Sequence, residues 1–237
     1  MYLDESKPII IAHRGAKYYE PENTIRAILR AIELGADVVE IDVRMCKDGI
    51  PVVIHDANLK RLTGVDKLVK DLTIHELRNL KVFGKEPIPT LEDVLRTIRD
   101  RIPLIIEVKE PGIEDKVVKL IEKYGLVNNV MIVSFYDQIL HRVKKLNKLL
   151  KIGLITSKFP IPLDILKDLE AHALFPRINL VGHEYVQILH RHRYKVYPWV
   201  INDLYTACQI IDFGADGFAT DKPDLKKYLK YLGRLRY

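Results

Sequence analysis

Residues 10–15 of this chain, Ile-Ile-Ala-His-Arg-Gly, form an apolar run that stops at a histidine, an arginine and a glycine. A similar arrangement recurs at residues 39–44, Val-Glu-Ile-Asp-Val-Arg, and at residues 104–109, Leu-Ile-Ile-Glu-Val-Lys. Short runs rich in Ile and Val are typical of buried strands. Each predicted strand thus carries charged side chains toward its carboxyl end, where α/β proteins place their functional groups.

Eight apolar runs of this kind alternate with helical patterns, which is the order of a parallel sheet with crossover helices. At 237 residues, the chain is close to the roughly 250 typical of a (β/α)8 barrel. No linker rich in Pro, Gly or Ser divides it. We therefore predict an α/β fold, a single (β/α)8 TIM barrel over residues 1–237. The predicted strands lie near residues 9–12, 38–43, 104–109, 130–135, 152–156, 173–178, 195–200 and 217–220.

A hairpin and a small insertion follow the second predicted strand. The Asp48-Gly49 pair is a turn signal, so residues 51–56 are expected to fold back along that strand. Residues 58–86 fit neither one strand nor one long helix. We predict a short loop and a helix near 73–81 that covers one side of the barrel mouth. Helix caps are expected at Asn23 or Thr24 for the first helix, and at Asp137 for the helix after Phe135.

The second predicted strand carries two carboxylates on one face. Because side chains alternate along a strand, Glu40 and Asp42 point the same way, roughly 6.8 Å apart. Two such groups repel each other and lose hydration unless a cation lies between them, and a divalent metal is the simplest solution. Glu107, at the end of the strand near 104–109, supplies a third oxygen ligand. Oxygen ligands favour Mg²⁺ or Ca²⁺, with Mn²⁺ as a further option.

Two histidines and two cations are expected around this acidic cluster. The hairpin brings His55 toward the carboxylates, and His13 ends the first strand. Imidazoles can remove a proton from a nucleophile and return one to a leaving group near neutral pH. Lys109 would sit beside the metal, where a second cation requires an anion such as a phosphate group. Arg14 presents a guanidinium at the tip of the first strand.

In the order and spacing of these residues, the chain resembles the glycerophosphodiester phosphodiesterases, in particular their small bacterial and archaeal form. The resemblance implies that Glu40, Asp42 and Glu107 hold a metal. It also implies that His13 and His55 act as general base and acid, and that Arg14 and Lys109 grip the phosphate. The matching stretches are 13–15, 21–24, 40–42, 48–49, 55–56, 61–64, 88–91, 107–109, 134–135, 199–202 and 220–223.

The activity implied by the resemblance is hydrolysis of glycerophosphodiesters to glycerol 3-phosphate and an alcohol. In that family the neighbouring glycerol hydroxyl attacks phosphorus first, and water then opens the cyclic phosphate. The chain departs from the family pattern at Cys46, where a small hydroxylic residue is more common. Residues 157–194 match only loosely, and this stretch falls where the alcohol of the substrate would be read.

Several single residues have two interpretations. Taken alone, Glu40 and Glu107 could be ion-pair partners of Arg14 and Lys109. However, six polar groups end three strands and a hairpin, and this number favours a functional site. An ion-pair network at that place would cost desolvation free energy and give little stability. Three residues have two open interpretations: Arg44 as a surface residue or a salt-bridge donor, Asp56 as a brace of its loop or a partner of an imidazole, and Trp199 as an apolar wall for glycerol or a core residue. Glu22 is expected to tie down the loop beside the first strand. The other six histidines are interpreted as surface groups: His75, His141, His172, His183, His190 and His192.

The net charge of +6 and the pI near 9.1 come mostly from basic residues dispersed over many helices. A C-terminal cluster of bases with interleaved tyrosines could bind nucleic acid. The same spacing fits a last amphipathic helix that packs Tyr228, Leu229 and Leu232 on the barrel, and we predict this packing and no nucleic-acid partner. The basic cluster comprises Lys226, Lys227, Lys230, Arg234 and Arg236.

Targeting signals and spans are not expected. The apolar run at residues 8–12 is too short for a signal peptide, and no run approaches the roughly 20 residues that a membrane helix needs. We therefore expect a cytoplasmic protein with reduced Cys46 and Cys208. The sequence leaves the oligomeric state open.

Two other functions compete with the main interpretation. One is a lysophospholipase D-like or phospholipase C-like enzyme that acts on lipid head groups, which a wide apolar mouth would favour. The other is a non-catalytic binding barrel, which would have lost a histidine or carboxylate of the set. Release of glycerol 3-phosphate from a panel of glycerophosphodiesters, with and without a chelator, separates the three.

Overall fold

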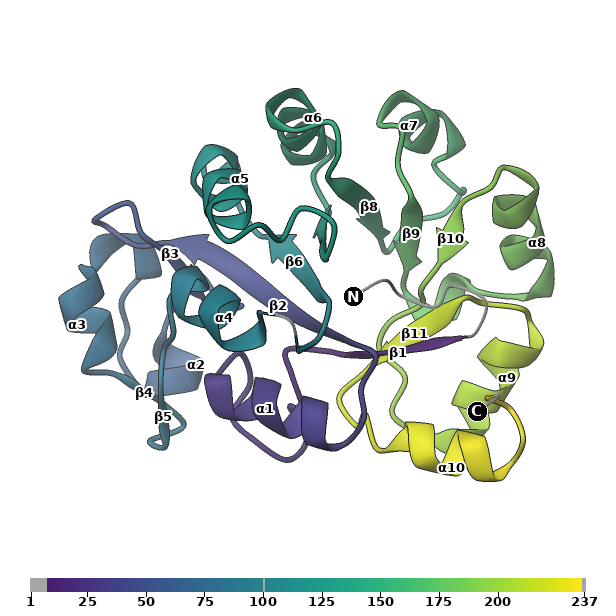
Figure 1. Ribbon diagram of the computed structural model, residues 1–237, viewed down its shortest axis with the longest axis horizontal. Helices are drawn as coiled ribbons and strands as arrows, with labels where there is room; N and C mark the ends of the chain where they lie inside the picture. The colour runs from purple at the N-terminus through teal and green to yellow at the C-terminus, as the bar shows by residue number, and fades with distance from the viewer. Residues whose placement is uncertain (1–7, 100, 236–237) are drawn as a thin grey trace.

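The computed structural model describes residues 8–99 and 101–235, and within them eight parallel strands form a barrel (Figure 1). The strand order is β10-β9-β8-β7-β6-β2-β1-β11, so each strand lies beside its neighbour in the alternating pattern. The predicted TIM barrel is therefore confirmed. The strands are β1 (Ile9–Ala12), β2 (Val38–Met45), β6 (Leu104–Val108), β7 (Val130–Ser134), β8 (Lys151–Thr156), β9 (Ala173–Pro176), β10 (Lys195–Val196) and β11 (Gly217–Thr220).

The barrel closes between the β10 segment and β11 through backbone hydrogen bonds. The amide of Asp216 donates to the carbonyl of Val196 at 3.1 Å, and the amide of Ala219 donates to that of Pro198 at 2.9 Å. β10 ends at Val196, so the predicted strand 195–200 is shorter than expected. Pro198 has no amide hydrogen to donate to a ladder, which explains the early end.

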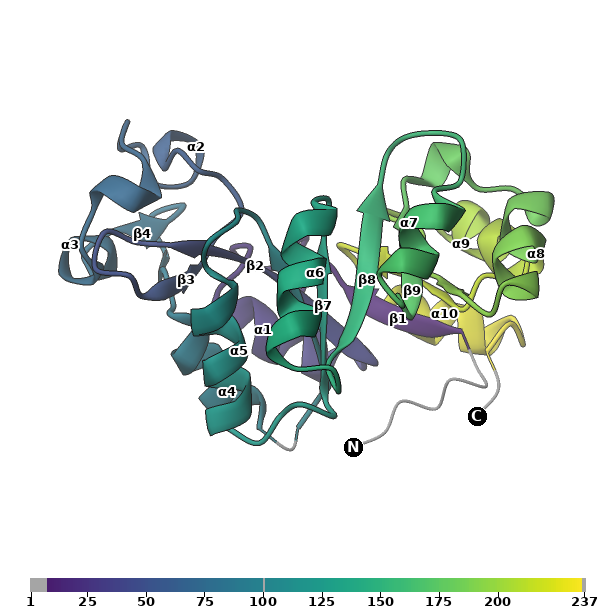
Figure 2. The same ribbon diagram turned by 90° about the horizontal axis from the view of Figure 1, so that it is seen from above.

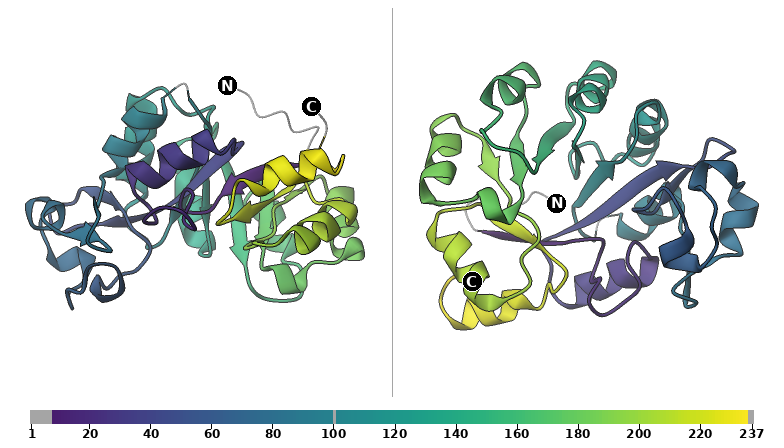
Figure 3. Two further views of the ribbon diagram at one scale, coloured as in Figure 1. Left: turned by 90° about the horizontal axis from the view of Figure 1, so that it is seen from below. Right: turned by 180° about the vertical axis from the view of Figure 1, so that it is seen from behind.

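Helices surround the strands on the outside, as Figure 1 and the right-hand view of Figure 3 show. Their buried apolar faces pack on the outer faces of the strands, while the inner faces of the strands fill the barrel. Strands covered on both sides read as continuous apolar runs, which is why they could be recognised. The helices are α1 (Ile25–Glu33), α4 (Leu91–Ile98), α5 (Glu114–Lys123), α6 (Asp137–Leu146), α7 (Leu163–Asp168), the short 3-10 turn η2 (Ile178–Leu180), α8 (His183–Arg191), α9 (Leu204–Asp212) and α10 (Leu225–Tyr231).

The expected caps are correct for α1 and wrong for α6. Thr24 is the N-cap of α1, and its hydroxyl accepts from the amide of Ala27 at 3.1 Å. Asn23 does not cap the helix; it has a φ of 59° and turns its side chain toward β2. Asp137 is the first helical residue of α6, and Tyr136 occupies the cap without a side-chain hydrogen bond.

The hairpin forms as predicted, with β3 (Pro51–Val53) antiparallel to β2. The insertion is richer than a loop and one helix, and it projects to one side of the barrel (Figure 2). The helix predicted at 73–81 covers only α3, because residue 81 already begins a small hairpin. The insertion contains α2 (Lys60–Thr63), the 3-10 turn η1 (Val69–Asp71), α3 (Ile74–Arg78), β4 (Lys81–Val82) and β5 (Glu86–Pro87).

A separate apolar cluster holds the insertion together. Leu59, Leu62 and Leu77 are buried in it, together with Cys46 of the β2–β3 connection. Tertiary packing within this cluster decides the short elements, which explains why helical periodicity alone missed them.

The C-terminal helix packs on the barrel only in part as predicted. Leu229 is fully buried, whereas Tyr228 and Leu232 are half exposed. Lys226 pairs with Asp37, and Arg234 pairs with Asp212, so part of the basic cluster is neutralised; Arg236 lies outside the described residues. Cys46 is buried and Cys208 half-buried, both as free thiols. Within the described part of the chain, every helix is too short or too polar to cross a membrane.

The loop that follows β1 turns sharply at two residues with positive φ, Arg14 at 55° and Gly15 at 79°. A Cβ atom on Gly15 would lie 2.7 Å from the backbone carbonyl carbon of Ala27 in α1. Glycine is therefore required here both for its conformation and for its lack of a side chain. The turn brings the backbone of residues 13–15 against the start of α1.

We predict that Gly15→Ala destabilises the protein by about 3 kcal/mol, because it adds a backbone clash to the cost of a positive φ. Gly35→Ala is the matched control: Gly35 has a φ of 81° with open space around it, so the cost there should be only about 1 kcal/mol. Urea unfolding of both variants measures the difference. Equal losses of stability would contradict the steric argument.

Candidate active site

Three acidic side chains meet at the carboxyl end of two neighbouring strands. Glu40 and Asp42 come from β2, and Glu107 from β6, in a register that pairs Asp42 with Glu107. One oxygen from each carboxylate lies within 4.8 Å of the other two. Glu40 is 7%, Asp42 1% and Glu107 9% exposed. The structure thus brings together the three acids that the sequence placed on strand ends.

Burial and mutual repulsion set the protonation of this acidic cluster. Burial, together with the charges of Asp42 and Glu107, raises the pKa of Glu40 well above its usual range. Burial and the charge of Asp42 raise the pKa of Glu107 to about 7, against the opposing effects of Lys109 and Arg14. Burial would also raise the pKa of Asp42, but Arg14 and Lys109 hold it below its ordinary value. Without a cation bound among the acids, these shifts favour the protonated form of Glu40 and Glu107.

Two oxygens of the cluster accept no hydrogen bond although they are buried, Glu40 Oε1 and Asp42 Oδ1. The other oxygens of these carboxylates are engaged: the amide of Arg14 donates to Glu40 Oε2 at 2.8 Å, and Asn23 Nδ2 donates to Asp42 Oδ2 at 2.8 Å. Buried oxygens without donors are costly unless a cation completes them. The donor set and its free lone pairs therefore fit a hard divalent ion.

Two cations flank the cluster. Lys109 Nζ donates to Glu107 Oε1 at 2.6 Å and lies 3.4 Å from Asp42 Oδ1. Arg14 Nε lies 3.1 Å from Asp42 Oδ2, and Arg14 Nη1 donates to Glu22 Oε1 at 2.9 Å. These ion pairs offset part of the negative charge. Both cations also line the cavity next to the acids, where an anion can reach them.

His13 is oriented by a carboxylate from the opposite end of the chain. Its Nδ1 lies 2.7 Å from Oδ1 of Asp221, the residue that follows β11. Asn202 Nδ2 donates to the other oxygen of Asp221 at 3.0 Å, and Lys17 lies 3.8 Å from Asp221 Oδ1. Because Nδ1 is engaged, Nε2 is the ring nitrogen left for proton transfer. Burial lowers the pKa of His13, which favours a neutral ring.

His55 has its own carboxylate partner, Asp56, whose Oδ1 lies 2.7 Å from His55 Nδ1. Both roles considered for Asp56 are observed, because it contacts the imidazole and its Oδ2 also accepts from Nε of Arg61 at 2.6 Å, which braces the loop. Arg44 donates from Nε to the carbonyl of His55 at 2.8 Å and forms an ion pair with Glu110. Arg44 is thus a salt-bridge donor that also braces the loop. Burial lowers the pKa of His55 as it does that of His13.

A cavity of about 140 Å³ opens beside these groups. Trp199 lines it, half-buried, with its indole N–H donating to the carbonyl of Phe175 at 2.8 Å. Its ring meets Phe135 edge to face, with 5.8 Å between the ring centres. Trp199 therefore combines the two interpretations considered for it, because its ring lines the cavity and also packs against Phe135. The lining combines charged or titratable side chains with apolar ones. The first group is His13, Arg14, Glu40, His55, Glu107 and Lys109, and the second is Ile11, Ile105, Val133, Phe135, Ile155, Phe175, Trp199 and Ala219.

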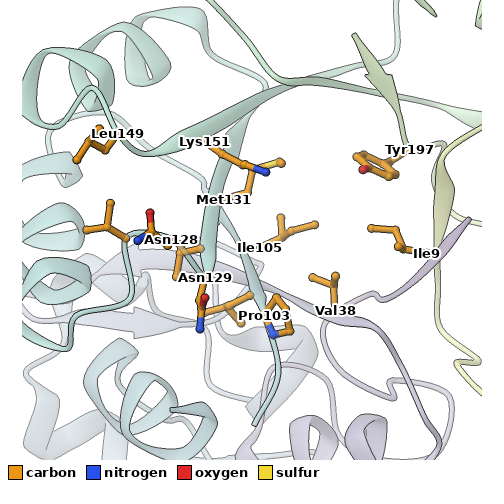
Figure 4. A pocket seen from close by; sticks show the side chains of 13 residues that line it. Ile9, Val38, Pro103, Ile105, Asn128, Asn129, Met131, Leu149, Lys151 and Tyr197 are labelled. Atoms are coloured by element: carbon orange, nitrogen blue, oxygen red, sulfur yellow. The ribbon is translucent and has the colours of Figure 1, made fainter. Parts of the chain in front are cut away.

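A larger cavity of about 390 Å³ lies at the other end of the barrel, where the strands begin (Figure 4). Ile9, Val38, Met131 and Tyr197 point into it, beside Lys151. Its lining is mostly apolar and includes none of the three acids or the two histidines of the cluster. The chemistry of the side chains, rather than the size of the hollow, therefore locates the site.

Sequence reasoning gave no role to Asn202, Asp221 or Arg61, although each lies in a stretch that matches the family. Asp221 follows an apolar strand, as His13 does, and this position could have identified it. The six remaining histidines lie outside the site: four are exposed and two half-buried, with His190 paired to Asp216 and His141 to Asp168.

Comparisons with known proteins agree with this geometry. A model of the Glycerophosphoryl diester phosphodiesterase family matches residues 13–225. A glycerophosphodiester phosphodiesterase of Caldanaerobacter subterraneus is 38% identical over 232 residues, covering 92% of this chain and 96% of that protein. A mouse protein named lysophospholipase D is 30% identical over 272 residues, covering 92% of this chain and 85% of that protein.

Among solved structures, a phosphodiesterase from Oleispira antarctica in complex with the product sn-glycerol-3-phosphate has a TM-score of 0.88 with this chain. It is 27% identical, and the match covers 97% of this chain and 100% of that one. The family model spans most of the chain, and the fold agrees over nearly its whole length. The chain therefore belongs to the glycerophosphoryl diester phosphodiesterase family.

Proposed function

We propose that the chain hydrolyses glycerophosphodiesters to glycerol 3-phosphate and an alcohol, with a divalent metal and two histidines. The observation that carries this proposal is a buried trio of carboxylates with free oxygens, flanked by two imidazoles that are each held by an aspartate. The product complex of the Oleispira phosphodiesterase supports the choice of substrate.

Glu40, Asp42 and Glu107 would hold the metal, with Mg²⁺ or Ca²⁺ as the first candidates and Mn²⁺ as a third. When bound, such an ion polarises phosphoryl oxygens and lowers the pKa of a bound hydroxyl. The three carboxylates, Arg14, Lys109 and a divalent ion together carry one net positive charge. This charge suits a phosphodiester, which carries a single negative one.

In this proposal, two cationic side chains bind the phosphate and two histidines transfer protons. Arg14 and Lys109 bind the non-bridging phosphate oxygens and hold phosphorus in the cavity. His13 Nε2, in a ring kept neutral by burial, takes the proton of the attacking hydroxyl, and Asp221 stabilises the imidazolium that forms. His55 gives a proton to the leaving alkoxide from its imidazolium form, which the carboxylate of Asp56 favours against the opposing effect of burial on the pKa of His55. In the second half of the reaction, the two rings exchange these roles.

A coupled assay for glycerol 3-phosphate tests the proposal directly. The purified protein is offered glycerophosphocholine, glycerophosphoethanolamine and glycerophosphoglycerol with Mg²⁺, Ca²⁺ or Mn²⁺, and with EDTA. We expect release of glycerol 3-phosphate that stops with EDTA and returns when metal is restored. No release with any metal would overturn the proposal, and release unaffected by EDTA would overturn its metal-dependent mechanism.

A lysophospholipase D-like activity is the second candidate, and exposed aromatic rings around the mouth favour it. Such rings are suited to an acyl chain or a lipid surface. The assay panel therefore includes lysophosphatidylcholine, from which this activity releases choline. A kcat/KM higher than that for glycerophosphocholine would favour the second candidate. These rings are 41–77% exposed and lie in the segments after β1, β7 and β8 and at the start of α9: Tyr18, Phe135, Tyr136, Phe159 and Tyr205.

We predict that His13→Ala and His55→Ala each lower kcat by about 10²- to 10⁴-fold, because each removes a group that transfers a proton. Melting temperatures should stay near that of the wild type, since both rings lie at the rim of a cavity. His190→Ala, which breaks a similar imidazole–carboxylate contact with Asp216 on the outside of the barrel, is the matched control and should keep full activity. Unchanged kcat in both site variants would remove the assignment.

Glu40→Gln should raise the metal concentration needed for half-maximal activity by about 10- to 100-fold, because it deletes one charged ligand. The measurement is a metal titration of activity for wild type and variant. An unchanged metal requirement would show that Glu40 is not a ligand.

Metal should stabilise the protein more at pH 8 than at pH 5. The pKa of Glu107 is raised to about 7, so the metal-free fold gains stability from this group below pH 4.5 and loses it as the pH rises through 7. Metal must displace these protons at low pH but not at pH 8. The check is the melting-temperature difference between Mg²⁺ and EDTA at pH 5, 6, 7 and 8; a difference that is constant or largest at pH 5 would contradict the prediction.

A further inference from the structure

Arg61, in α2 of the insertion, holds two carboxylates with one guanidinium. Its Nε donates to Asp56 Oδ2 at 2.6 Å, and its Nη2 donates to Asp56 Oδ1 at 3.2 Å. On its other edge, Nη1 donates to Glu22 Oε2 at 2.9 Å, and Nη2 donates to Glu22 Oε1 at 2.8 Å. Both contacts are bidentate, so the planar guanidinium acts as a clamp between two segments of the chain.

Each of these carboxylates also contacts a residue of the site. Asp56 Oδ1 lies 2.7 Å from Nδ1 of His55, and Glu22 Oε1 accepts from Nη1 of Arg14 at 2.9 Å. An unbroken series of contacts therefore runs from His55 through Asp56, Arg61 and Glu22 to Arg14. Its two ends are the imidazole proposed to protonate the leaving group and the guanidinium proposed to bind phosphate.

Because Glu22 is buried, its carboxylate needs both of its cationic partners. Glu22 is 2% exposed and is placed between two cations, Arg14 and Arg61. Removing one cation would leave a buried carboxylate only half compensated, and it would draw Arg14 toward itself. A lysine at position 61 would keep the charge, but a single ammonium cannot make two bidentate contacts at once.

We propose that Arg61 is a positioning residue that fixes the ring of His55 and the guanidinium of Arg14 together, so that the insertion completes the active site. This inference rests on the proposed function. The buried neighbours Leu59 and Leu62 anchor α2 in the apolar cluster of the insertion, which gives the clamp a fixed base. The insertion is thus a brace for two functional groups.

The test compares Arg61→Lys with Arg142→Lys. Arg142, in α6 on the outside of the barrel, also makes a bidentate contact, with Asp115 at 2.9 and 3.2 Å. The two arginines are similarly exposed, 45% and 49%. We expect Arg61→Lys to lower kcat/KM by about 100-fold at an unchanged melting temperature, because small displacements of catalytic groups are costly. Arg142→Lys should stay within about twofold of the wild type.

Steady-state kinetics can distinguish the His55 end of the clamp from the Arg14 end, because the two ends should affect kcat and KM differently. Asp56→Asn should lower kcat with little effect on KM, and Glu22→Gln should raise KM with a smaller effect on kcat. In the Asp56→Asn/Glu22→Gln background, adding Arg61→Lys should change kcat/KM by less than about twofold, because the groups through which Arg61 acts are already altered. A merely structural role predicts instead losses that multiply and follow the melting temperature.

Binding of glycerol 3-phosphate, measured by calorimetry, tests the Arg14 end without turnover. We expect Arg61→Lys and Glu22→Gln to weaken it by about tenfold, and Arg142→Lys to leave it unchanged. If the wild type binds glycerol 3-phosphate but releases none, the proposed function fails while the Arg14 end of the clamp is still tested by these affinities. The inference is overturned if Arg61→Lys has the same activity and the same affinity for glycerol 3-phosphate as Arg142→Lys. If Arg61→Lys does not fold, the kinetics of Asp56→Asn and Glu22→Gln decide the question.

Discussion

Three carboxylates buried at one end of a barrel repel one another, and the surrounding structure is organised around that repulsion. Asn23 and the amide of Arg14 donate to two of the acids, and Arg14 and Lys109 supply positive charge from two sides. These partners still leave two buried oxygens without a hydrogen bond, of which Asp42 Oδ1 has only the ion pair with Lys109 at 3.4 Å. Buried carboxylates whose charge and hydrogen bonds are incompletely compensated add little to the stability of the fold. This supports the proposal that they form a binding site for a cation and an anion.

The sequence predicts the parts of this site that follow from periodicity. Side chains two apart on a strand share a face, and parallel strands align their carboxyl ends, so Glu40, Asp42 and Glu107 could be placed together before any coordinates. The hairpin turn at Asp48-Gly49 likewise predicts the approach of His55. The same regularity identifies all eight strands, although Pro198 ends one of them earlier than its apolar pattern indicates.

Periodicity cannot predict contacts that depend on long-range docking or on the direction of a long side chain. Asp221 reaches His13 across 208 residues of sequence because the last strand lies beside the first. Arg61 reaches Glu22 because α2 is fixed by an apolar cluster whose members are scattered between residues 46 and 88. The packing of this cluster also decides the length of α3, which is shorter than the helix predicted near 73–81. These features come from tertiary packing, which local patterns do not encode.

The seam between β10 and β11 has a consequence for the motions of the site. β10 supplies only two residues to the sheet, whereas β2 and β6 are paired over five positions. Trp199, Asn202 and Asp221 are attached at this thin closure, but the three acids sit on the long ladder. Amide protons near the seam should therefore exchange with solvent sooner than those of β2 and β6. The environment of His13 would then fluctuate while the three acids stay in place, so the fold separates a rigid acidic cluster from a more mobile imidazole.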